Sequence, residues 1–386
     1  MSIPAPVSAI RPLPQAPGVN SVTSDFRIGD SPANDFEIGE SRARDLRDGD
    51  SPANDSPAND SPVNGSPAGR SPAAAPPAEN RLGAYARLGK LDVYDYYPAV
   101  AVALSALVPP AGRPVPGALT ASALFLCGSV FVIMAMVALD DVTGYRDGSD
   151  IANYGPDDPL RNKRRKPLVS GELTVPQALA FARVTAAAGA LLWTGATLAA
   201  PYRPLWTLGL LAALFVVSLQ YSYGLRISYH GFQEAFICGL GVGMVMATYG
   251  LAAGRFSGFL LVQAVLFGFG PLMFGVYSNT NDIPGDRAVG RPTVAALTSP
   301  RGNALFVGAL SAAEFLLGVS ACATGLAPWW FVPLMLPVTA LRTHQYLVGF
   351  RTGDVMRARR IGFRAHRVGF VLLIAANLLA GAEATA

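Results

Sequence analysis

Nine long apolar runs, separated by short polar loops, dominate the chain from residue 92 onward. Most of them are close to the ~20 residues that a helix needs to cross a bilayer. Backbone groups find no water in the hydrocarbon core, so helices are the expected structure there. The first run is the shortest. The sequence therefore predicts an all-α, multi-pass transmembrane bundle of about nine helices, at residues 92–109, 116–139, 174–199, 204–225, 231–253, 256–279, 302–324, 327–348 and 363–383.

The composition agrees with a membrane protein, because 51% of the residues are hydrophobic and only 15% are charged. A soluble protein carries about a quarter charged residues, so a soluble nucleic-acid binder is excluded. The three cysteines lie singly inside apolar runs, which excludes a disulfide scaffold and argues against a zinc site.

The basic residues predict an orientation. Of the 24 Lys and Arg residues after residue 80, 21 lie before the first run, in even-numbered loops, or beside those loops. Positive charge marks the cytoplasmic side. We therefore expect an integral protein of the cell membrane, whose amino terminus and even-numbered loops face the cytoplasm.

The first 80 residues have a different character. Ten-residue units rich in Asp and Gly decay into five-residue Ser-Pro-Ala-Asn-Asp units. These units are too short to pack as a solenoid, and they hold too little apolar surface to offset the entropy of ordering. The predicted organisation is a disordered tail at 1–80 followed by one membrane domain at 81–386.

Carboxylates concentrate in two of the predicted cytoplasmic loops. The loop after the second run holds four aspartates: Asp140, Asp141, Asp147 and Asp150. The loop after the sixth run holds an asparagine and two aspartates: Asn279, Asp282 and Asp286. If the second run continues as a helix, all but Asp141 in the first set share one face, and the second set does so at i, i+3 and i+7. Mg²⁺ takes one or two carboxylates plus phosphate oxygens, so two facing stripes would hold a diphosphate through bridging metal ions.

Basic residues accompany both acidic loops. Lys166 ends a cationic run after the first loop, and Arg287 and Arg291 lie beside the second. Acids for metal and bases for phosphate are the groups that diphosphate chemistry needs. The alternative is that the acids are solvated loop residues and the cations only set the topology. The repetition argues against it, because Asp141 and Asp282 each end an apolar run, four runs apart.

At these loops the sequence resembles the UbiA-type superfamily of intramembrane prenyltransferases. Asp140 and Asp141 take the places of the Asn-Asp pair that opens the family's first motif, and Asp150 takes the place of its last aspartate. Gly144 stands where the middle aspartate belongs, which is a departure from the pattern. Asp147, one turn further on, is a candidate to supply the missing carboxylate.

Two further segments carry the resemblance, which covers roughly residues 88–385. Lys166-Pro-Leu-Val-Ser-Gly171 matches the signature that follows the first motif. The second motif is matched by Asn279, Asp282, Gly285, Asp286, Gly290 and Thr293. Its first aspartate has become Asn279.

The resemblance implies nine transmembrane helices and the ionisation of an allylic prenyl diphosphate with Mg²⁺ as cofactor. It implies catalytic roles for Asp141 and Asp282. The implied metal ligands are Asp140, Asp141, Asp147, Asp150, Asn279, Asp282 and Asp286. The cations expected to bind the diphosphate are Lys166, Arg226, Arg287 and Arg291. The rings that would face the carbocation are Tyr221, Tyr223 and Tyr277, for each of which packing is an alternative role.

A further acid begins the fifth run. His230 and Glu234 lie at i and i+4, which predicts one helix face. A carboxylate at the start of an intramembrane helix is costly and is therefore a functional candidate. We expect Glu234 to bind or deprotonate an acceptor; the alternative is a helix-start acid favoured by the dipole.

Three functions remain open at this point. The first is transfer of the prenyl group to an aromatic or other electron-rich acceptor. The second is a terpene cyclase of the same superfamily, which uses no acceptor; the changes at Gly144 and Asn279 keep it open. The third is a transporter or scaffold, which gives no reason for two matched acidic loops. The expected partners are a prenyl diphosphate, a small acceptor and the lipid bilayer, with no nucleic acid and no protein partner.

Overall fold

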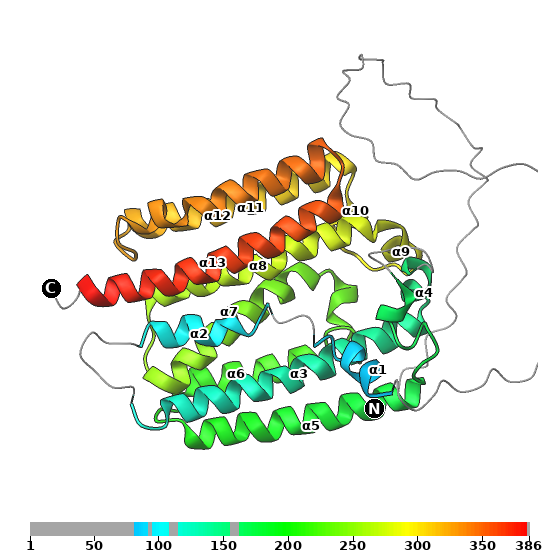
Figure 1. Cartoon of the computed structure of the whole chain (residues 1–386), viewed down its shortest axis with the longest axis horizontal. Coiled ribbons are helices and arrows are strands. Elements are labelled where there is room, and N and C mark those ends of the chain that lie inside the picture. The colour runs from blue at the N-terminus through cyan, green and yellow to red at the C-terminus, as the bar shows by residue number, and fades with distance from the viewer. Residues whose placement is uncertain (1–80, 92–94, 108–114, 155–161, 384–386) are drawn as a thin grey trace, which may run out of the picture. The chain divides into compact units, whose positions relative to one another are not determined.

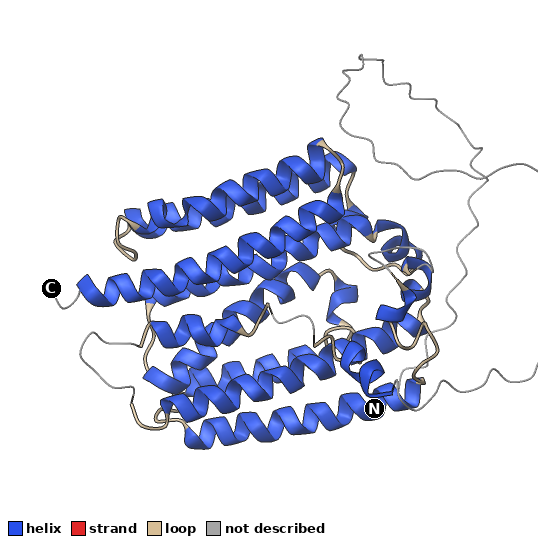
Figure 2. Ribbon diagram, viewed as in Figure 1, coloured by secondary structure: helices blue, strands red, loops and turns tan. Residues whose placement is uncertain are grey.

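The structure is a computed structural model that describes residues 81–91, 95–107, 115–154 and 162–383. Within these ranges every regular element is a helix or a helical turn, and no strand occurs (Figure 2). The predicted all-α class is confirmed. The predicted disordered tail at 1–80 lies outside the described residues.

Six helices are long and apolar enough to cross a membrane, and they confirm an integral membrane protein. A shorter apolar helix, α6, spans Leu205–Leu219. α12, Phe331–Tyr346, continues into a π-helical turn at Leu347–Arg351. The six long helices are α3 (Ala118–Arg146), α5 (Val175–Ala199), α7 (Gln233–Ala253), α8 (Gly258–Asn281), α11 (Pro300–Ala323) and α13 (Val355–Glu383).

The first predicted span differs from the prediction. Its helix, α2, spans only Pro98–Ser105, which at 1.5 Å per residue is about 12 Å long. A helix of that length does not cross a hydrocarbon core of about 30 Å. The apolar run at 92–109 indicated its position but not its length, and residues 92–94 and 108–114 lie outside the described part.

The helices pack in the order α5, α3 and α6, then α7 with α2, then α8 and α13, with α11 and α12 outermost (Figure 1). α7 contacts helices on both sides of the bundle. It approaches α8 so closely that a Cβ added to Gly241 would lie 2.9 Å from the Cα of Gly268. Small residues permit such close helix packing inside membranes.

Three buried polar residues inside the bundle form one hydrogen-bonded group. Arg342 on α12 donates from Nε to Glu314 on α11 at 2.7 Å, and its Nη1 donates to Gln345 at 3.0 Å. Gln345 in turn donates to the carbonyl of Met273 on α8 at 3.0 Å. Arg342 and Glu314 are both buried, so the pairing removes the cost of two isolated charges in an apolar core.

Short elements gather at one end of the bundle (Figure 1). They begin or end the polar loops that carry the predicted site. They are α1 (Arg81–Leu88), α4 (Ser149–Asn153), α9 (Ile283–Ala288), α10 (Val294–Leu297) and the 3₁₀ turns Lys163–Arg165 and Ile227–His230.

Candidate active site

A cavity of ≈ 570 Å³ lies at the end of the bundle where the two acidic loops meet. α4 and α9 touch there, because a Cβ added to Gly285 would lie 2.2 Å from the Oδ1 of Asn153. The structure thus brings together predicted residues that are far apart in the chain. Those that line the cavity are Asp140, Asp150, Lys166, Tyr221, Asn279, Asp282, Asp286 and Arg291.

The first acidic cluster is built around the ammonium group of Lys166. Its Nζ lies 2.7 Å from Oδ1 of Asp141 and 2.8 Å from Oδ2 of Asp150. Lys90, which follows α1, adds a second ammonium 3.3 Å from Asp141. Burial alone would lower the pKa of Lys166, but the two carboxylates outweigh it and hold this pKa well above its usual value. The lysine is therefore charged. The second carboxylate oxygen of the buried Asp141, Oδ2, has no hydrogen-bond partner.

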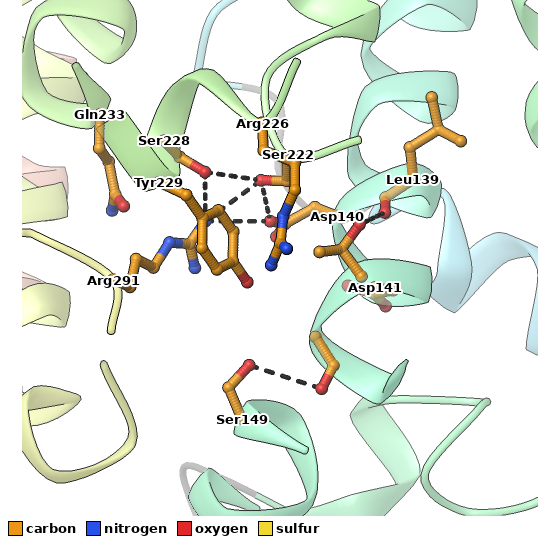
Figure 3. A network of polar contacts seen from close by, with 12 residues as sticks. Leu139, Asp140, Asp141, Ser149, Ser222, Arg226, Ser228, Tyr229, Gln233 and Arg291 are labelled. Carbon is orange, nitrogen blue, oxygen red and sulfur yellow. Dashed lines mark hydrogen bonds and ion pairs between the residues drawn. The ribbon is translucent and has the colours of Figure 1, made fainter. Parts of the chain in front are cut away.

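Asp140 joins this cluster to the loop after α6. It accepts a hydrogen bond from Ser222 at 2.6 Å and one from Arg291 at 3.3 Å. Arg291 also donates to the hydroxyls of Ser222 and Ser228, at 3.2 and 3.0 Å (Figure 3). Burial opposes the charge of Arg291, but Asp140 stabilises it and the pKa rises overall. Arg291 is thereby fixed at the cavity wall.

Asp147 does not line the cavity, and the predicted continuous helix through residue 150 is wrong. α3 ends at Arg146, and Gly148 follows with a φ of +85°, a conformation that favours glycine. The turn follows Asp147, which faces the loop after α6 as Asp140 does: Tyr229 donates to the carboxylate of Asp147, and Arg226 lies 3.3 Å away. The ring of Tyr229 lies 3.7 Å from the guanidinium of Arg226 (Figure 3). Arg226 also does not line the cavity.

The second cluster comes from the end of α8 and from α9. Asp286 accepts a hydrogen bond from Thr293 at 3.1 Å, and burial raises its pKa to about 6. Asn279 accepts from Gln233 at 2.7 Å and donates to Glu234 at 3.1 Å. Its amide therefore serves one donor and one carboxylate at once.

Glu234 lies behind Asn279, not on the cavity wall. The backbone N–H of Val294 donates to the same carboxylate oxygen, at 3.2 Å. The predicted face shared by His230 and Glu234 is wrong, because Gly231, with a φ of +81°, separates the turn that holds His230 from α7. Glu234 is buried, whereas His230 is exposed.

Three further predicted residues lie away from the cavity. Arg287 donates to the carbonyls of Ala296 and Thr298, at 2.9 and 3.4 Å. Tyr277 is fully buried against Phe350. Tyr223 packs on the apolar cluster between α1, α3 and α5.

Tyr221 is the predicted tyrosine that lines the cavity. Its ring stacks on Phe236, with centroids 4.4 Å apart. The ring face that does not stack on Phe236 is the one that could stabilise a cation.

Sequence reasoning missed Lys90 and Gln233. Lys90 precedes the first run, where a cation reads as an ordinary topology signal. Gln233 adjoins Glu234 at the start of an apolar helix, and a polar pair at that depth is the signal that could have identified it.

The cavity residues fit Mg²⁺. Among the residues described, no three carboxylate, histidine or cysteine side chains converge on one point. Mg²⁺ needs only one or two carboxylates when phosphate and water supply the other oxygens. Asp150, Asp282 and Asp286 place three carboxylates on the cavity wall. Asp141 is buried and is not part of the lining, but it shares Lys166 with Asp150, and its Oδ2 has no hydrogen-bond partner.

Known proteins share this architecture. The structure of a digeranylgeranylglyceryl phosphate synthase is 13% identical, with a TM-score of 0.54 over 78% of this chain and 99% of its own. A UbiA homologue from Archaeoglobus fulgidus, bound to DMAPP and Mg²⁺, is 14% identical, with a TM-score of 0.52 over 75% of this chain and 98% of its own. The apo UbiA homologue from Aeropyrum pernix K1 is 17% identical, with a TM-score of 0.52 over 74% and 96%.

At these identities the structures establish the fold. No curated protein sequence matches the chain. The model of the UbiA prenyltransferase family matches residues 98–380, which is most of the chain. The chain therefore belongs to the UbiA prenyltransferase family.

Proposed function

We propose that the protein is a membrane-embedded, Mg²⁺-dependent prenyltransferase that ionises an allylic prenyl diphosphate and transfers the prenyl group to an aromatic or other electron-rich acceptor. The observation that carries the proposal is the pairing of two carboxylate clusters with two cations, the buried Lys166 and the half-buried Arg291, around one cavity. Family membership and the DMAPP and Mg²⁺ bound by the A. fulgidus homologue support it.

The carboxylate pairs would hold the metal and, through it, the diphosphate. Asp141 with Asp150 is the first pair and Asp282 with Asp286 the second. Bound Mg²⁺ supplies positive charge that neutralises the diphosphate oxygens. Asp140 holds Arg291 in place, and Gln233 with Glu234 holds the amide of Asn279 toward the cavity.

Lys166 and Arg291 would stabilise the leaving group. When the bond between the allylic carbon and the diphosphate oxygen breaks, its electron pair leaves with the diphosphate. Fixed cations aimed at that developing charge lower the barrier. Tyr221 offers its ring face to the allylic cation. The acceptor carbon then forms the new bond to the prenyl carbon, and its proton passes to the released diphosphate.

The buried location serves the same chemistry. A carbocation reacts with water, and the membrane helices that adjoin the cavity would limit the access of water to a bound prenyl chain. By the distribution of Lys and Arg we place both acidic loops and the amino terminus on the cytoplasmic side of the cell membrane. Charged diphosphate would then enter from the cytoplasm, while the prenyl chain lies toward the lipid.

The test uses the full chain in lipid nanodiscs with Mg²⁺ and prenyl diphosphates of several lengths, with and without aromatic acceptors. We expect a prenylated acceptor, loss of turnover in EDTA, and loss in Asp141→Ala and Asp282→Ala. Asp354→Asn is the matched control, because Asp354 is an exposed acid outside the cavity.

Diphosphate release with a hydrocarbon product and no need for acceptor would replace the transferase with a terpene cyclase. An enzymatic function would be refuted by two results together: no turnover under any condition, and no change in the producing cell when Asp141→Ala or Asp282→Ala replaces the native chain.

A further inference from the structure

The carboxylate of Asp150 lies directly on the backbone of α3 at Gly144. A Cβ added to Gly144 would lie 2.7 Å from the Cγ of Asp150 and 2.8 and 3.0 Å from its two oxygens. Packed protein interiors do not accept such distances without movement. No side chain fits at position 144 while the carboxylate of Asp150 stays where it is.

Space, and not backbone conformation, explains the glycine at position 144. Gly144 lies in the last turn of α3 and is absent from the described residues with positive φ. Glycine is among the least favourable residues inside a helix, so its presence there calls for a packing reason. Gly148 is the opposite case, because it has a φ of +85° and open space around it. Gly148 allows the chain to turn after α3, and Gly144 leaves room for the carboxylate of Asp150.

The returning carboxylate reaches the same cation as Asp141. Lys166 lies within 2.8 Å of both Asp141 and Asp150, although these residues are on different helices. Asp147 is nearer to Asp141 in sequence, but Tyr229 and Arg226 hold it outside the cavity. Asp141 and Asp150 therefore come together across the turn that separates α3 from α4.

We propose that Gly144 is a positioning residue of the metal site, and that its missing side chain is what admits Asp150 beside Asp141. This inference rests on the proposed function for the identity of the metal. The steric coupling between Gly144 and Asp150 does not depend on it, which allows the two to be tested separately.

The binding test titrates Mn²⁺, as a probe for the Mg²⁺ site, into detergent-solubilised full chain and follows it by electron paramagnetic resonance. Changes around metal ligands typically weaken binding about 10–100-fold, so we expect Gly144→Ala and Asp150→Asn each to weaken Mn²⁺ binding at least tenfold. The double variant should bind no more weakly than the weaker single variant. Gly209→Ala is the matched control, because this helical glycine of α6 has no neighbouring atom within 4 Å of an added Cβ.

The second test uses thermal unfolding without metal. Alanine normally stabilises a helix relative to glycine, so Gly209→Ala should keep or raise the melting temperature. Gly144→Ala should lower it, and adding Asp150→Gly should reverse the loss. Gly144→Asp combined with Asp150→Gly should recover Mn²⁺ binding. The Cβ of the new aspartate would lie 2.7 Å from the place that the Cγ of Asp150 now occupies, so its carboxylate would reach the same region.

The outcomes separate the two proposals. A wild-type chain that binds no Mn²⁺ overturns the metal site and with it the proposed function, while the unfolding series still reports the steric coupling. Normal binding by Gly144→Ala, or single effects that multiply in the double variant, overturns the role of Gly144 and leaves the proposed function standing.

Discussion

The contact between Asn279 and Glu234 allows a sharp test of how charge is arranged behind the second cluster. The amide nitrogen of Asn279 donates to Glu234 at 3.1 Å, and both side chains are buried. Asn279→Asp replaces this donor with a second carboxylate at the same distance. Gln233 still donates to the other oxygen of residue 279, so the change isolates one repulsive contact.

The size of the effect follows from the smaller of two costs. At 3.1 Å and an effective dielectric constant of about 20, two carboxylates repel by about 5 kcal/mol. Protonating one of them costs about 1.4 kcal/mol for each pH unit above a pKa of about 4.3, or about 4 kcal/mol at pH 7 and about 1 kcal/mol at pH 5. We therefore expect Asn279→Asp to lower the free energy of unfolding by about 4 kcal/mol at pH 7 and by much less at pH 5.

The sign follows from linkage. A proton on either carboxylate relieves the repulsion, so the loss of stability should be present at pH 7 and should shrink as the pH falls to 5. The assay is chemical unfolding in detergent micelles with EDTA at both pH values. Glu234→Gln should restore most of the loss, because its amide can donate to the new carboxylate.

The control for burial alone is Asn303→Asp. Asn303 is buried and donates to Thr280 at 2.9 Å, and a loss of stability there should not respond to Glu234→Gln. The reasoning is refuted if Asn279→Asp loses the same stability at pH 5 and pH 7, or if Glu234→Gln gives no recovery.

Three other predictions address separate parts of the molecule. Lys166→Met should retain Mn²⁺ binding, because it removes a competing cation, yet reduce kcat by about 100-fold in steady-state assays, because it removes a donor to the leaving group. Burial raises the pKa of Asp286 to about 6, so protons should compete with the metal below that value; titrations at several pH values should show metal affinity falling up to about tenfold per unit as the pH drops from 6. In the membrane part, Arg342→Met should cost about 3–5 kcal/mol by leaving Glu314 unpaired, and adding Glu314→Leu should recover much of it in detergent unfolding measurements.

Most helix positions were predictable from the sequence because long runs of hydrophobic residues mark the segments that a bilayer buries. The run predicted at 174–199 is α5 at Val175–Ala199, and the acids that end the second and sixth runs lie at one end of the bundle. The pairing of acids with Lys166 and Arg291 around one cavity was also predictable, because charged side chains are costly in an apolar chain and are therefore found mainly at functional sites.

The details of the site depend on backbone turns that hydrophobic patterns do not encode. Asp150 was assigned to the same face as Asp140 and Asp147 on the assumption of a continuous helix. Gly148 interrupts that helix and places Asp150 on α4, while Asp140 and Asp147 both contact the loop after α6. Gly231 breaks the register between His230 and Glu234 in the same way. The direction of Tyr277 follows from packing against Phe350, and spacing along one helix does not report which neighbour a buried ring meets.

The central position of α7 has a mechanical consequence. One acidic cluster is carried by α3 and the other by α8, and α7 packs against both. The spacing of the two clusters therefore depends on how closely α7 lies to its neighbours. Gly241 and Gly268 are two close points between α7 and α8, because an added Cβ would lie 2.9 Å from the Cα of Gly268 and 2.5 Å from the carbonyl oxygen of Cys238, respectively. A methyl group at either position would push α7 and α8 apart. The distance between the two carboxylate clusters would then increase at the open end of the bundle, and that distance determines the size of the diphosphate group that both clusters can contact.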